Sequence, residues 1–63
     1  MKYRIVNWTN GRFGYKKYFE LQCYNTVYKN WYCVKNALRL YFIENECSIK
    51  GIDFKSLEII EIS

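Results

Sequence analysis

The first part of the chain alternates apolar and polar side chains, which is the pattern of a β-hairpin. Residues Lys2–Trp8 alternate as a strand. Asn10-Gly11 follows, and this dipeptide suits the positive φ angles of a tight hairpin turn. A returning strand over about Phe13–Tyr24 then places alternate apolar residues on the core face: Phe19, Leu21 and Cys23.

The charges of this hairpin conflict with a two-residue loop. Such a loop places Arg4 opposite Lys17, and like charges directly opposite each other are destabilising. A β-bulge near Gly14 would shift the register by one residue and remove the conflict. The alternative is that Arg4, Lys16 and Lys17 form a cationic cluster that binds an anion. We favour the bulge because Gly14 is well placed for it, but bulges often re-aim side chains beside functional sites, so the two are compatible.

The middle of the chain repeats apolar residues at spacings of three and four, which is typical of one helical face. These residues are Val27, Trp31, Val34, Leu38, Tyr41 and Phe42. The spacing predicts a helix over about Trp31–Asn45, with Asn30 as its N-cap. We expect its aromatic residues to lie in the core.

The last part of the chain predicts a turn and a short strand. Gly51 favours a turn, and Ser56–Ile62 is rich in β-branched residues. Glu58 and Glu61 interrupt this run, which suits an edge strand or a strand half-covered by a partner. The elements predict one α+β domain over residues 1–63, a two-layer ββαβ arrangement: an N-terminal β-hairpin and a C-terminal strand, with one helix packed on the sheet. The sheet face away from the helix is the candidate site.

The number of aromatic rings and the positive charge limit how this chain can fold on its own. Aromatic residues make up 21% of the 63 residues, and the formal net charge is +4. The first two thirds of the chain are strongly basic, whereas residues 43–63 are acidic overall. A domain this small cannot leave half of its rings in water and still fold alone. Either most of the rings lie in the core, or a partner covers them, and the partner that we favour is a second copy in a homodimer.

The residue types argue against catalysis and against a bound metal. The chain has no histidine to serve as a base for a cysteine nucleophile, no Cys-x-x-Cys pair for zinc, and no glycine-rich phosphate loop. We expect a protein that is not an enzyme and has no cofactor. The three cysteines are odd in number and widely spaced, which is typical of reduced thiols in a cytoplasmic protein. No targeting signal and no apolar segment of about 20 residues is evident, so we expect no membrane association.

Two functions fit this description. The first is a small intracellular protein that binds and inhibits or modulates a host protein. Codons rich in A and T encode Lys, Asn, Ile, Tyr and Phe, which are abundant here, and this favours a phage-type accessory protein for host takeover or counter-defence. The alternative is binding of nucleic acid or a nucleotide on the hairpin. Its candidate residues are Arg4, Arg12, Tyr15, Lys16, Lys17, Tyr18 and Tyr24.

Overall fold

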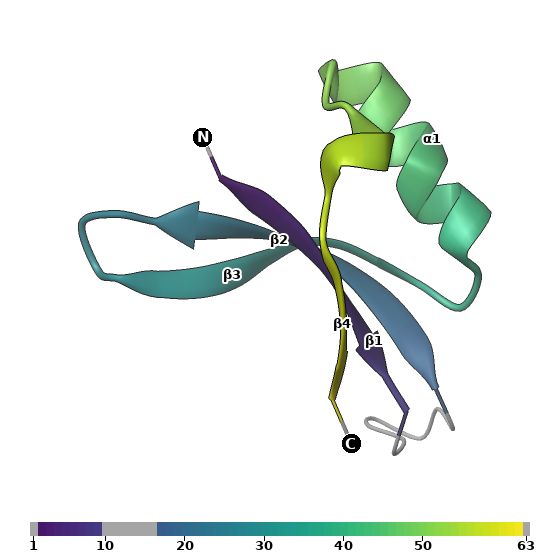
Figure 1. The fold of residues 1–63 in the computed structure, drawn as a ribbon, viewed down its shortest axis with the longest axis horizontal. Coiled ribbons are helices and arrows are strands. Elements are labelled where there is room, and N and C mark those ends of the chain that lie inside the picture. The colour runs from purple at the N-terminus through teal and green to yellow at the C-terminus, as the bar shows by residue number, and fades with distance from the viewer. Residues whose placement is uncertain (1, 10–16, 63) are drawn as a thin grey trace.

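The computed structural model describes residues 2–9 and 17–62, and over these it forms an α+β domain. The elements in chain order are β1 (Tyr3–Trp8), β2 (Tyr18–Asn25), β3 (Asn30–Ala37), α1 (Leu40–Lys50), the 3-10 turn η1 (Phe54–Ser56) and β4 (Ile59–Ile62). The strands form a single sheet in the order β3-β2-β1-β4 (Figure 1). The predicted class, a small α+β domain with one helix on a sheet, is confirmed.

Antiparallel pairs join β1 to β2 and β2 to β3, whereas β4 runs parallel to β1. The predicted edge strand is confirmed, since β1 is the one strand of the described sheet with which β4 pairs. The β2–β3 hairpin projects beyond the rest of the sheet (Figure 1). Its turn is closed by Asn25, whose Oδ1 accepts hydrogen bonds from the backbone N–H groups of Val27 and Tyr28 at 2.9 and 3.0 Å. Lys29 completes the turn in the left-handed region, with φ 56°.

The core lies between α1 and the sheet. Ile5, Leu21, Ile43 and Cys47 are fully buried and form its centre. Partly buried apolar residues surround them: Tyr3, Phe19, Val34, Ala37, Leu40, Ile52, Phe54 and Leu57. The helix packs on β2 and β3 and contacts η1 (Figure 1). The predicted core face of β2 is therefore confirmed.

The ends of α1 explain two features of the sequence. Gly51 caps the C-terminus with φ 74°, a conformation that glycine adopts without strain, so the predicted turn is confirmed. Glu46 near this end opposes the helix dipole but forms an ion pair with Lys50, with Nζ and Oε2 3.5 Å apart.

The predicted helix over Trp31–Asn45 was wrong in its first part, where the chain forms β3. Asn30 is the first residue of this strand and not a helix N-cap, and α1 begins at Leu40. The β2–β3 register shifts between Leu21 and Gln22, so Val34 is an extra residue on β3. The bulge places Val34 and Ala37 against the core at a spacing of three, which imitates the period of a helix.

The pairing of Arg4 with Lys17 that a two-residue loop would impose does not occur. Arg4 lies opposite Gln22, and β2 begins at Tyr18. The like-charge conflict is therefore absent from the sheet. The predicted turn at Asn10-Gly11 and the predicted bulge near Gly14 lie outside the described residues.

Candidate functional site

Arg4 is the centre of a group of cations and rings on the sheet face opposite α1. Its neighbour Ile5 points into the core, so Arg4 points to the other face. The Arg4 Cζ atom lies 4.1 Å from the ring centroid of Trp31, and Nε donates a 2.8 Å hydrogen bond to Oε1 of buried Gln22. The Lys2 Nζ atom lies 6.0 Å from the same ring. Both cations are thus within cation–π range of one indole.

Tyr24 completes this group, and the strand ladder sets its position. Tyr24 lies opposite Trp31 in the β2–β3 register, and the two rings meet edge to face with centroids 5.1 Å apart. The Tyr24 backbone N–H donates to the Lys2 carbonyl at 2.9 Å. Three strands therefore supply one cation–ring cluster, which we define as Lys2, Arg4, Tyr24 and Trp31.

The positive charge of the cation–ring cluster is not neutralised by an ion pair within residues 2–9 and 17–62. Glu46 and Lys50 form the one ion pair of the described part of the chain, and both belong to α1. Glu58 is a neighbour of Arg4 across β1 and β4, where its carbonyl accepts the Ile5 N–H, but its carboxylate forms no ion pair with Arg4. The cluster is therefore a local positive region.

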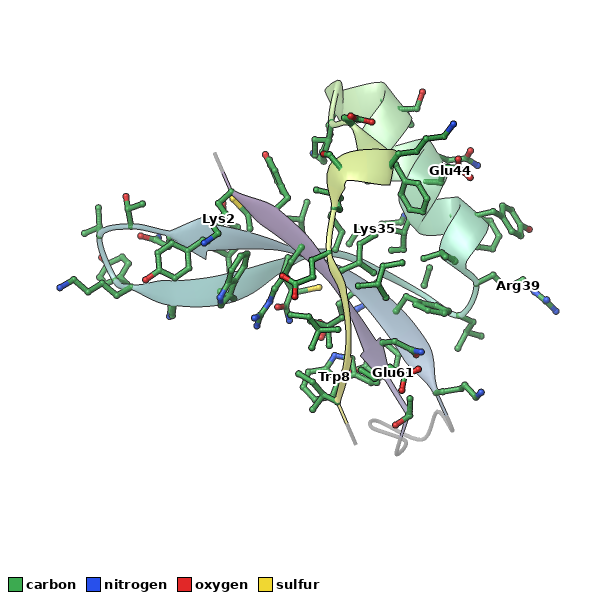
Figure 2. The ribbon with its side chains drawn as sticks, in the orientation of Figure 1. Lys2, Trp8, Lys35, Arg39, Glu44 and Glu61 are labelled. Atoms are coloured by element: carbon green, nitrogen blue, oxygen red, sulfur yellow. The ribbon has the colours of Figure 1, made fainter. Side chains whose placement is uncertain are left out.

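A pocket lies beside the cation–ring cluster, where β1 begins and the β2–β3 hairpin continues. It has a volume of about 410 Å³ and is lined by Lys2, Tyr24, Asn25, Thr26 and Tyr32. Figure 2 shows Lys2 at this end of β1, with Trp8 at the other. A hydrogen bond to Cys23 raises the pKa of the Tyr32 phenol above its ordinary value of 10.0.

The centre of the same sheet face is closed by its own side chains. Val6 has no exposed surface and Tyr18 is 4% exposed. The rings of Trp8 and Tyr18 stack at a centroid distance of 6.4 Å, and Trp8 Nε1 donates a hydrogen bond to Glu20. This face therefore offers its rings to a ligand at the hairpin end rather than along its whole length.

The predicted site residues separate into three groups. The structure brings Arg4 and Tyr24 together in the cation–ring cluster. It places Tyr18 in the buried stack with Trp8, and exposed Lys17 in the bend before β2. The remaining three lie outside the described residues: Arg12, Tyr15 and Lys16.

Sequence reasoning missed Lys2 and Trp31. Trp31 was assigned to a helical core stripe, but it is a half-buried strand residue that packs on Arg4 and Tyr24. The dense run of β-favouring residues in Trp31–Val34 was the available signal for a strand. No sequence pattern indicates that Lys2 belongs to the site, because it meets the Trp31 ring only when the β2–β3 hairpin has formed.

A second candidate surface covers the outer side of α1. Three large apolar residues lie there, and we name them the α1 outer face: Tyr41, Phe42 and Ile49, which are 53%, 44% and 80% exposed. Phe42 and Ile49 are two helical turns apart, and the Tyr41 ring contacts the Phe42 ring with centroids at 4.2 Å. Ile43 and Cys47, on the opposite side of the helix, are fully buried. The expectation that Tyr41 and Phe42 are core residues was therefore wrong, since α1 is apolar on both sides.

The cysteines have two kinds of environment. Cys23, which was predicted on the core face of its strand, is buried, and so is Cys47, whereas Cys33 is exposed. All three are free thiols. Partial burial, with a further contribution from Glu20, raises the pKa of Cys33 from 9.0 to about 11. Because the thiolate is the nucleophile, Cys33 is a weak nucleophile at neutral pH.

Within the described residues, no group of three or more His, Cys, Asp or Glu side chains is placed to hold a metal ion. The one α-helix of this part of the chain is too short to cross a membrane. Comparison of the chain with models of protein families, with curated proteins and with solved structures gave no match.

Proposed function

We propose that the protein is a small, non-catalytic binding module that docks on another protein through the α1 outer face. The observation that carries this proposal is the exposure of three large apolar side chains on one side of α1 while the other side fills the core. Exposed apolar patches on proteins often mark interaction sites, and the rings of Tyr41 and Phe42 form such a patch by contacting each other.

The chemistry of the α1 outer face suits a protein partner. Aromatic side chains are enriched at the centres of protein interfaces, and Tyr41 and Phe42 present adjacent rings. Arg39, which precedes the first residue of α1, and Glu44 within α1 are both exposed and would form a charged rim (Figure 2). An apolar centre with a polar rim is the usual arrangement of an interface.

The partner that we propose is a host protein in the cytoplasm, which the module inhibits or modulates. The abundance of residues with A- and T-rich codons supports a phage-type accessory role in host takeover or counter-defence. A second copy of the chain would cover the same apolar surface, and a homodimer is therefore the competing occupant.

Capture from a host lysate tests this proposal when it is paired with matched variants. The wild-type chain should retain a protein that Phe42→Ser and Ile49→Ser lose. Tyr28→Ser is the control, because Tyr28 is 77% exposed but lies in the β2–β3 turn, away from α1. Equal capture by all variants would contradict docking through the α1 outer face. Light scattering of the purified chain tests whether a second copy covers this surface. If the wild type is a dimer and Phe42→Ser is a monomer, the α1 outer face binds a second copy of the chain and not a host protein.

Binding of nucleic acid or a nucleotide is a second candidate function. The observation that favours it is that Lys2 and Arg4 lie together beside two rings without an ion-pair partner among the described residues. Binding of a nucleic acid strand would weaken steeply as salt increases, because bound cations are released from the phosphates. A gel shift that fails at low salt would exclude this function.

A further inference from the structure

We propose that the cation–ring cluster and the adjoining pocket form a site for a nucleoside phosphate, with the phosphate bound by Lys2 and Arg4 and the base in the pocket. This inference narrows the second candidate function to a small ligand and one end of the sheet. It does not depend on the α1 outer face, so its failure leaves the proposed protein docking intact.

The phosphate part of the site follows from the state of Arg4. One hydrogen bond from Nε to Gln22 and the stacking on Trp31 hold the guanidinium in place. No described residue accepts a hydrogen bond from the terminal N–H groups of Arg4, and a planar guanidinium matches the geometry of a phosphate. Lys2 adds a second charge near the same ring. A dianionic phosphate would supply the counter-charge that the described carboxylates do not supply.

The base part of the site follows from the pocket. Its volume of about 410 Å³ falls in the range of small-molecule sites, which is roughly 300–1,000 Å³. Tyr24 and Tyr32 line the pocket from opposite faces of the sheet, because Tyr24 pairs with Trp31 and Tyr32 pairs with Cys23, and Asn25 and Thr26 add polar groups. A base in the pocket would therefore contact one of the two rings. The Asn25 side chain is already fixed by the turn, so this wall is formed before a ligand binds.

The arrangement also explains why a long strand of nucleic acid is not the preferred ligand. The next rings along the face, Trp8 and Tyr18, stack on each other, and Tyr18 is almost fully buried. Among the described residues of this face, successive bases would therefore find stacking surface at the hairpin end. A single nucleotide needs no more than that.

Calorimetry with AMP tests the site directly, with adenosine, inorganic phosphate and a short oligothymidine as comparison ligands. AMP should bind more tightly than adenosine or inorganic phosphate, and the oligothymidine should not exceed AMP. The affinity for AMP should fall about tenfold or more in Arg4→Gln and in Lys2→Gln, because each removes a charge-assisted contact. Lys55→Gln removes the same charge from η1 and should leave the affinity within twofold.

Three results would overturn the proposal. Absence of AMP binding would exclude the site. Equal affinity for AMP and inorganic phosphate would exclude a base in the pocket. Binding of the oligothymidine without binding of AMP would show that Lys2 and Arg4 bind a nucleic acid strand and not a single nucleotide. Lys2 is exposed and its side chain carries no part of the core, so Lys2→Gln remains informative if Arg4→Gln impairs folding.

Discussion

The guanidinium of Arg4 stacks on the indole of Trp31, with Cζ 4.1 Å from the ring centroid, although β2 separates the strands that carry them. The contact crosses above Gln22, which accepts the hydrogen bond from Arg4 Nε. One side chain thus links three strands on the face that α1 does not cover. We infer that this contact stabilises the projecting β2–β3 hairpin on the body of the sheet.

Arg4 and Trp31 should show energetic coupling in a double-mutant cycle. Cation–π pairs contribute about 0.5–1 kcal/mol at exposed sites and ~2 kcal/mol when desolvated, and this pair is half-buried. Urea unfolding of Arg4→Gln, Trp31→Leu and the double variant should therefore give a coupling free energy of about 0.5–1.5 kcal/mol. Strictly additive losses would show that the stacking contributes nothing to stability.

The two sides of α1 should respond differently to one and the same substitution. Ile43 has no exposed surface, whereas Ile49 is 80% exposed. Ile43→Val should lower the free energy of unfolding by about 0.5–1.5 kcal/mol, since it removes a buried methylene group from a packed core. Ile49→Val should stay within about 0.5 kcal/mol of the wild type. Urea midpoints measure both, and equal losses would contradict the orientation of the helix.

Cys33 should be the one thiol of the native chain that reacts with an alkylating reagent. Cys23 and Cys47 are buried, and Cys33 is exposed but has its pKa raised to about 11. Mass spectrometry after a short exposure should show a single adduct, formed slowly at pH 8 and faster as pH rises towards 11. Two or three adducts on folded protein, or a rate profile centred at pH 9, would contradict this environment.

The raised pKa of Cys33 also predicts that the folded state loses stability as pH rises above 9. The folded-state pKa of Cys33 lies above its ordinary value of 9.0, so the folded state holds the proton more tightly than the unfolded chain. The stabilisation that comes from the tightly held Cys33 proton is complete below pH 9 and is lost as pH rises from 9 to 11. The urea midpoint should decrease across this interval, and by less in Cys33→Ser, which lacks the thiol.

The sequence predicted the elements that follow simple periods. Alternation identified β1, β2 and the core face that carries Leu21 and Cys23, and Gly51 marked a turn, although the helix before it runs to Lys50 and not to about Asn45 as predicted. The β3 strand escaped prediction for two physical reasons. The extra residue Val34 breaks its alternation, and its turn contains no glycine or proline, because Asn25 closes it and Lys29 adopts the left-handed conformation.

The candidate site was less accessible to sequence reasoning than the fold. Arg4 and Tyr24 were named because they lie on one hairpin, but their actual neighbour Trp31 comes from the missed strand. The α1 outer face was hidden for a related reason. The helix lies further along the chain than predicted, and it buries Ile43 and Cys47 instead of Tyr41 and Phe42. The sequence of α1 offers apolar residues on both sides, so the packing of the helix on the sheet determines which side is buried.

The affinity of the captured protein partner for variants of the α1 outer face tests the proposed docking most directly. Truncation of a central aromatic residue typically costs ~2 kcal/mol or more, which is more than about tenfold in Kd. We expect Phe42→Ser to weaken binding by at least this factor in calorimetry, and Tyr28→Ser to leave Kd within twofold. Unchanged affinity of Phe42→Ser, with a loss in Tyr28→Ser, would move the docking surface from α1 to the β2–β3 turn and contradict the proposal.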